Sequence, residues 1–158
     1  MHDFPPAWSP GRTYTFDVVL RHAGVGRTGF QAAARFAYGS DAGRDAGRFR
    51  AGAGAAVVSG LNAHVTYVQH AEEGTLPQWP DSARWRITWT APDRGGRIVL
   101  HIAANAANND DSPLGDFVYT ATRTTEPAEK IAVRESSRPP TGRPAPSTRA
   151  PGRPRHRL

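Results

Sequence analysis

The fold is decided by residues 85–119, which read WRITWTAPDRGGRIVLHIAANAANNDDSPLGDFVY. In the first part Trp85, Ile87 and Trp89 alternate with polar residues, which is the period of a half-buried β-strand. A turn at residues 92–96, a second apolar run, an Asn/Asp-rich segment and a third run follow. Three strands joined by turns in this order predict an all-β domain.

The rest of the first 123 residues continues the pattern. Residues 13–20 alternate as a strand does, and residues 29–36 place Phe30 and Phe36 on the same side as two alanines. Their three alanines would suit a helix equally well, but the glycines on both sides leave little length for a stable one. We expect further strands at 48–50, 55–59, 63–70, 84–90, 97–104 and 116–122. About eight short strands predict an immunoglobulin-like antiparallel β-sandwich.

The four tryptophans divide into two pairs. Trp85 and Trp89 share one face of their strand and are predicted to fill the space between the sheets. Trp8 and Trp79 lie near prolines in expected loops. They could be exposed binding aromatics, or they could close the open ends of the core.

Charge separates the chain into two regions. The formal net charge of the 158 residues is +6. Residues 1–123 hold 12 Arg against 11 Asp plus Glu, whereas residues 124–158 hold 8 Lys plus Arg against 3 Glu. We therefore predict a sandwich domain at 1–123 and a disordered, basic Pro/Arg-rich tail at 124–158. The tail could contact an anionic surface, but it lacks the aromatics that stack on bases, so no specific nucleic-acid partner is expected.

Several classes of site are excluded by composition. The chain has no cysteine, and therefore no disulfide, thiolate metal site or covalently attached haem of its own. No apolar stretch approaches the roughly 18 residues of a membrane span, and residues 1–20 lack the pattern of a signal peptide. The chain begins almost directly with a strand, so a leader upstream of this sequence remains an expectation.

Motifs of catalysis are weak. Residues 24–29 match G-x-G-x-x-G, but the helix and βαβ unit of a dinucleotide site are not indicated, so a turn between two antiparallel strands is favoured. No G-x-S-x-G element is present. The histidines lie on separate strands or strand ends, without helical metal spacing: His22, His64, His70 and His101. We therefore expect no enzyme.

The segment from Asn105 to Asp116 is the densest group of oxygen donors. Calcium takes six to eight oxygens, and this segment could supply several, although its spacing is not that of an EF-hand. Alternatively, the same side chains satisfy backbone groups through Asx turns in a long connection. The candidate ligand or ion contacts are Asn105, Asn108, Asn109, Asp110, Asp111 and Asp116.

One succession of residues resembles a known family. Trp89-Thr90-Ala91-Pro92, then residues 103–108 (AANAAN), then Gly115-Asp116 and Tyr119 are similar to the signature of the bacterial reelin-type (Reeler) domain, also called choice-of-anchor V. Residues 9–14 and 29–31 resemble that family's first strands. Together the matches cover about residues 9–122.

The resemblance implies an immunoglobulin-like sandwich in a secreted or envelope-anchored protein without enzymatic activity. The leading hypothesis is a non-catalytic extracytoplasmic binding or adhesion module that presents the Asn/Asp segment to an unknown envelope or extracellular ligand. Bacterial members often carry a C-x-x-C-H haem segment, which this chain lacks. The alternative is therefore the sandwich half of a haem-bearing envelope redox protein, with His70 as an axial ligand in a longer form. No cofactor is expected in this chain itself.

Overall fold

The computed structural model describes residues 1–61, 65–110, 112 and 114–128. This part contains nine strands and one 3₁₀ turn, η1 (Glu72–Gly74). The strands are β1 (Ala7–Trp8), β2 (Thr13–Arg21), β3 (Arg27–Phe36), β4 (Arg48–Ala51), β5 (Ala55–Ser59), β6 (Thr66–His70), β7 (Ser82–Thr90), β8 (Ile98–Ala107) and β9 (Phe117–Pro127). The predicted all-β class is confirmed.

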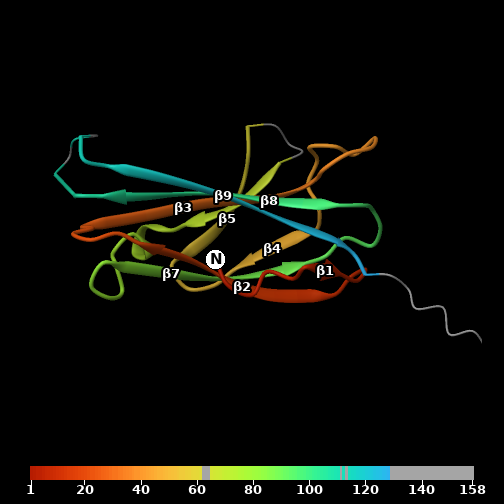
Figure 1. Cartoon of the computed structure of the whole chain (residues 1–158), viewed down its shortest axis with the longest axis horizontal. Helices are drawn as coiled ribbons and strands as arrows, with labels where there is room; N and C mark the ends of the chain where they lie inside the picture. The colour runs from red at the N-terminus through yellow and green to blue at the C-terminus, as the bar shows by residue number, and fades with distance from the viewer. Residues whose placement is uncertain (62–64, 111, 113, 129–158) are drawn as a thin grey trace, which may run out of the picture.

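The strands form two sheets that lie over one another as a sandwich (Figure 1). The larger sheet has six strands in the order β1-β9-β8-β3-β6-β5, and the smaller has three in the order β2-β7-β4. All neighbouring strands are antiparallel except β1 and β9, which are parallel. Within the described residues, no helix has the length and apolar character of a membrane span.

The Ala-rich segment is a strand, as predicted. β3 pairs with β8 over its whole length, from Arg27 opposite Ala107 to Phe36 opposite Ile98. The alanines at 32 and 34 face the core, and their small side chains leave room for the large aromatics of the opposite sheet. Pairing with β8 therefore makes this segment a strand, although its alanines would also allow a helix.

The ends of two strands differ from the prediction, and one strand was not predicted. β8 continues to Ala107, so Asn105 lies in a strand. β9 continues to Pro127, so residues 124–127 of the predicted tail are strand. The reason is β1, which was not predicted: the N–H of Glu126 donates to Pro6 O (3.3 Å) and that of Ala128 to Trp8 O (2.7 Å). Residues 129–158 of the predicted tail and 63–64 of an expected strand lie outside the described residues.

The glycine-rich segment 24–29 is a turn that enters β3 at Arg27, and it does not join paired strands. It carries the chain from β2 in the smaller sheet to β3 in the larger. The space at Gly26 is tight, because a Cβ there would lie 2.8 Å from Asn108 O. The segment is therefore a turn between strands, as favoured, but the two strands belong to different sheets and do not pair with each other.

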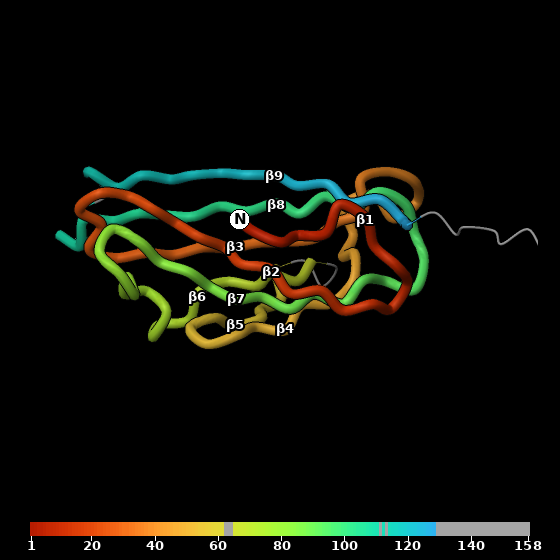
Figure 2. The backbone as a smooth tube through the Cα atoms, turned by 60° about the horizontal axis from the view of Figure 1, so that its bottom comes forward, coloured from red at the N-terminus to blue at the C-terminus, as the bar shows by residue number. Residues whose placement is uncertain are grey.

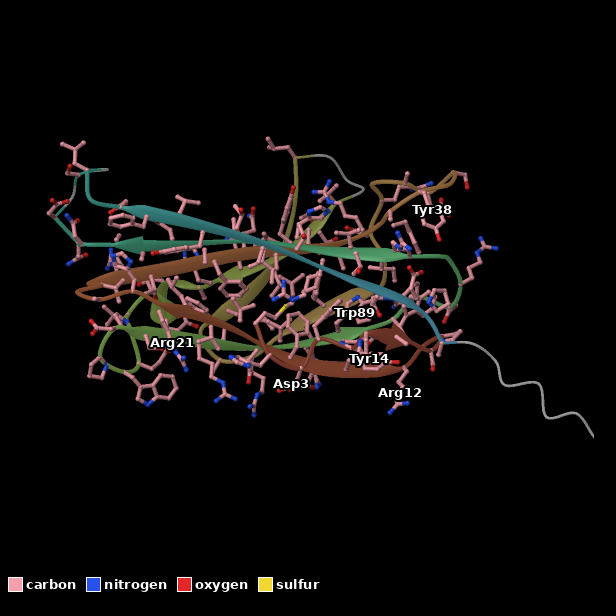
Figure 3. All side chains as sticks on the ribbon, in the orientation of Figure 1. Asp3, Arg12, Tyr14, Arg21, Tyr38 and Trp89 are labelled. Atoms are coloured by element: carbon pink, nitrogen blue, oxygen red, sulfur yellow. The ribbon has the colours of Figure 1, made fainter. Side chains whose placement is uncertain are left out.

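Tryptophans fill the space between the sheets. Trp85 and Trp89 are 1% and 0% exposed, as predicted, and each indole N–H reaches a backbone carbonyl: Gly74 O at 3.0 Å and Ala46 O at 2.8 Å. Figure 3 shows Trp89 between the sheets beside Tyr14, with ring centroids 5.8 Å apart. Trp8 is also buried, at 1% exposed, so its exposed alternative is wrong, whereas Trp79 is 53% exposed.

An ion cluster covers the outer face of the smaller sheet. Asp17 on β2 is 5% exposed and accepts hydrogen bonds from Arg84 and from Arg86 Nε (3.1 Å) on β7. Burial alone would raise the pKa of Asp17, but the hydrogen bonds and positive charges of Arg86 and Arg84 outweigh it. The pKa therefore lies below the ordinary value of 3.8.

This cluster predicts a pH dependence. A carboxyl whose pKa is lower in the folded state stabilises the fold above its unfolded pKa, and this contribution is lost as the pH falls through the folded value. We expect Asp17→Asn to lower the free energy of unfolding by about 1–2 kcal/mol near neutral pH, because both guanidinium groups remain partly exposed. The difference from the wild type should be constant above pH 3.8 and shrink below it. Urea unfolding between neutral pH and pH 2 measures this, and a gap that persists unchanged into acid would contradict it.

Candidate functional site

A hollow of about 510 Å³ opens on the outer face of the larger sheet, over β3, β6 and β8. It lies where β3 and β6 separate: their pairing is limited to Gln31 opposite Gln69 and Ala32 opposite Val68. We call it the amide hollow, and its polar lining residues are Arg27, Thr28, Gln31, Gln69, His70, Thr75 and Asn105.

His70 causes the separation of the strands. The next backbone rung would join His70 to Phe30, but the imidazole takes its place, with Nδ1 3.1 Å from both Phe30 N and Phe30 O. The imidazole fits only because residue 29 is glycine: a Cβ at Gly29 would lie 2.9 Å from Cε1 and 3.0 Å from Nδ1 of His70. His70 thus satisfies backbone groups that the sheet leaves unpaired.

The same geometry does not decide the haem prediction for His70. The ring edge that carries both nitrogens of His70 rests on Gly29, with Nε2 3.4 Å from the position of a Cβ there. A bond from Nδ1 to a backbone carbonyl is also what a metal-ligating histidine makes through its second nitrogen, so the contact with Phe30 does not distinguish the two roles. The structure thus gives no support to an axial role for His70, and no chemistry is assigned to a haem here.

Two of the predicted contact residues meet at the edge of the hollow. Asn105 on β8 donates from Nδ2 to Asp116 Oδ2 at 3.4 Å, just before β9 begins. The remaining oxygens, Asn105 Oδ1 and Asp116 Oδ1, are both buried without a hydrogen-bond partner. A buried acceptor without a donor costs about 1–3 kcal/mol, so these two oxygens need an explanation beyond the fold.

Two of the other predicted contact residues make hydrogen bonds within the loop. Asn108 donates to Asp110 Oδ2 (2.9 Å) and Leu114 O (3.2 Å) and accepts from Asp110 N (3.2 Å), which is an Asx turn. Asp110 Oδ1 accepts from Ser112 N at 3.0 Å. Asn109 has a φ of 63° at the tip. Asp111 lies outside the described residues. These bonds match the turn interpretation of the segment.

We therefore expect calcium to contribute nothing to the stability of the loop. EDTA should shift the melting temperature by less than about 1 °C, because a chelator destabilises only a fold that binds its ion. In contrast, Asn108→Ala should lower the free energy of unfolding by about 1 kcal/mol through loss of the turn. Thermal melts with and without EDTA measure both effects. A drop in melting temperature that calcium reverses would restore the ion-site prediction for Asn105, Asn108 and Asp116.

Sequence reasoning missed the amides on β3 and β6. Gln31 Nε2 donates to Gln69 Oε1 at 3.0 Å, across the last regular rung between these strands. The signal was present in part, since Gln31 interrupts an apolar strand on its outward side. That Gln69 lies opposite could not be known without the pairing register.

The fold was compared with solved structures. The human F-spondin reeler domain superposes with a TM-score of 0.51 at 17% sequence identity, covering 78% of this chain and 83% of that one. The chain has the fold of a reelin-type domain. No protein-family model and no curated protein matches the sequence.

Two further solved structures superpose less closely. A second crystal structure of the human F-spondin reeler domain has a TM-score of 0.48 at 19% identity, covering 78% of this chain and 86% of that one. AvmM, which catalyses macrocyclization in alchivemycin A biosynthesis, has a TM-score of 0.49 at 12% identity, covering 80% and 86%. Within the reelin-type fold of this chain, the Trp89–Pro92 motif ends β7 and Gly115-Asp116 precedes β9.

Proposed function

We propose that this chain is a non-catalytic binding module of the cell envelope or extracellular space, and that its ligand occupies the amide hollow. The reelin-type fold and the residue succession that resembles bacterial reelin-type domains support the location. The contact surface differs from the one favoured by sequence, because the loop at 108–116 is held by its own hydrogen bonds and lies beside the hollow.

The observation that carries the proposal is the oxygen of Asn105. Oδ1 is buried, lacks a donor and belongs to a side chain that lines the hollow. Because Oδ1 is buried in this conformation, a donor group of a ligand reaches it only when the Asn105 side chain turns toward the hollow, and this contact would then satisfy the oxygen. The hollow also lies within the usual size range of small-ligand sites, roughly 300–1,000 Å³.

The lining favours a neutral, hydroxyl-rich ligand. Gln69 and Asn105 offer amide donors and acceptors, and Arg27 adds a cation at the start of β3. No carboxylate belongs to the described lining, and Ala103, Ala107 and Val118 supply apolar surface between the polar groups. Hydroxyl groups both donate and accept, as the amides do, and the carbon face of a sugar ring suits the apolar patches.

The contacts of the histidines support a non-catalytic role. Among the described residues, His22 Nδ1 bonds Tyr119 Oη at 2.8 Å and His70 Nδ1 bonds the backbone of Phe30. Neither contact pairs the histidine with a serine or threonine hydroxyl. A serine or threonine nucleophile that histidine activates requires such a pair.

Binding is tested with two neutral oligosaccharide probes, chitotetraose and maltotetraose, titrated into the ¹⁵N-labelled full chain. We expect at least one probe to shift the amide resonances of Gln69, His70 and Asn105. Asn105→Leu should abolish those shifts, and Thr88→Ala, on the outer face of the smaller sheet, should retain them. Saturating amounts of both probes without shifts at the hollow, or shifts that survive Asn105→Leu, would contradict the proposal.

Location is tested separately. The native gene product, tagged at its C-terminus, is expected in the envelope or medium fraction of its own cells. Recovery in the cytoplasmic fraction alone would contradict the proposed location. It would not affect the proposed binding site, which the titration tests.

A further inference from the structure

β9 has a free edge along most of its length. On one side it pairs with β8 from Phe117 to Thr125. On the other side β1 reaches only Glu126 and Pro127. Figure 2 shows β9 along the margin of the molecule, with β1 at its end.

The direction of the free backbone groups follows from β1. Because the N–H of Glu126 points to Pro6 O, away from β8, the residues at alternate positions before it point the same way. The N–H and C=O groups of Val118, Thr120, Thr122 and Thr124 therefore face outward along the edge. Among the described residues, no other backbone group bonds to them; Thr122 O accepts a bond from the side chain of Arg123 (2.8 Å), which strand pairing would replace.

The side chains of this edge are also exposed. Phe117 and Tyr119, on the inner face of β9 beside His22, are 49% and 43% exposed, and Val118, on the outer face, is 70% exposed. A long edge with unpaired groups and large apolar side chains is a template for pairing with another strand. Proline, which would block it, is found in β9 only at its last residue, Pro127.

We propose that this edge pairs antiparallel with β9 of a second copy, about a two-fold axis that passes beside Ala121. The free stretch runs from Phe117 to Thr125, and Ala121 is its midpoint. Of the antiparallel registers, only the one centred on Ala121 pairs the whole stretch without running into β1. The two larger sheets then form one continuous sheet across the dimer.

The side chains agree with this register. Thr120 lies opposite the partner subunit's Thr122, and each of the outward-facing backbone groups finds a partner. Ala121 meets its own copy in a non-hydrogen-bonded pair, where strands approach most closely and a small residue fits best. Tyr119 lies opposite the partner subunit's Arg123, a pair of aromatic ring and cation that occurs twice by symmetry.

In a single chain, Arg123 also limits association at this edge, because a charged side chain on the inner face of an edge strand discourages pairing with other strands. In the register centred on Ala121 it finds the ring of the partner subunit's Tyr119. In a register centred on Arg123 it would face its own copy. The residue therefore selects between registers as well as limiting unspecific association.

Sedimentation equilibrium of the full chain tests the association. A single strand pair is a small interface, so dimers should form at concentrations of about 10–100 µM and above. The apparent mass should rise from 17.1 kDa toward twice that value. Thr122→Pro removes an N–H that faces the free edge and none that bonds β8, so it should give a monomer, whereas Thr122→Ala should still dimerise.

A cysteine test fixes the register, because the natural chain has no cysteine. Ala121→Cys should form a disulfide-linked dimer with oxidised glutathione, since the two Cα atoms lie about 4.5 Å apart in this pairing. Val118→Cys is the matched control: it is exposed on the same strand, but its two copies lie about 20 Å apart. We expect at least a tenfold difference in the initial rate of cross-linking.

Charged substitutions at Ala121, which lies on the two-fold axis, provide a third test of the dimer. Ala121→Lys and Ala121→Glu should each be monomeric, because the substituted residue meets its own charge, and a 1:1 mixture should dimerise. A monomer at every concentration up to 1 mM would overturn the proposal. The edge would then be expected to pair with an extended segment of a different protein. Equal cross-linking of the two cysteine variants would overturn the register.

Discussion

Trp85→Ala is expected to lower the free energy of unfolding by about 4–5 kcal/mol, enough to unfold a domain of ordinary stability. The side chain is 1% exposed, packs on Phe30 of the opposite sheet with centroids 4.7 Å apart, and donates to Gly74 O. The substitution therefore leaves a large cavity between the sheets and a carbonyl without its donor. Urea unfolding followed by far-ultraviolet circular dichroism measures the change.

Trp79→Ala is the matched control for this substitution. The same side chain is removed, but Trp79 is 53% exposed, so we expect a change of less than about 0.5 kcal/mol. Equal losses in the two variants would mean that Trp85 does not lie between the sheets.

Gly74→Ala is expected to be the second most damaging change, at about 3 kcal/mol. A Cβ at Gly74 would lie 1.9 Å from Gly54 O, a backbone atom that cannot rotate away. This close approach joins η1 to the turn before β5, and Gly54 in turn has Trp85 Cδ1 3.8 Å from its own Cβ position. The two glycines thus close the sandwich over the indole of Trp85.

Gly43→Ala provides the comparison for Gly74→Ala. Gly43 has a φ of +78°, but a Cβ there would meet nothing within 4 Å. We expect a loss of about 1 kcal/mol from backbone strain alone. Thermal melts of the two variants measure the difference, and a smaller loss at Gly74 than at Gly43 would contradict the packing described here.

Much of the sandwich follows from the sequence because alternation is a local signal. β2 and β7 could be recognised from residues 13–20 and 84–90, since each places apolar side chains on one face. β1 could not, because its two residues form a strand only through pairing with Glu126 and Pro127. The same pairing extends β9 beyond its predicted end and buries Trp8, which decides between the two alternatives for that side chain.

The site was predictable only in part. Asn105 could be selected because it belongs to a dense group of oxygen donors, and the structure places it in the lining of the hollow. The hollow itself depends on His70 replacing a rung between β3 and β6, with Gly29 beneath it. That arrangement joins residues about 40 positions apart, and alternation within one strand carries no information about it.

The contact between Phe30 and Trp85 tests the central claim most directly, because it joins the two sheets and requires residues 27–36 to be a strand. In a NOESY spectrum of the full chain, the ring protons of Phe30 should show cross-peaks to the indole of Trp85 at the observed centroid distance of 4.7 Å. Absence of these cross-peaks, with helical i to i+3 contacts along residues 30–36 in their place, would contradict the account.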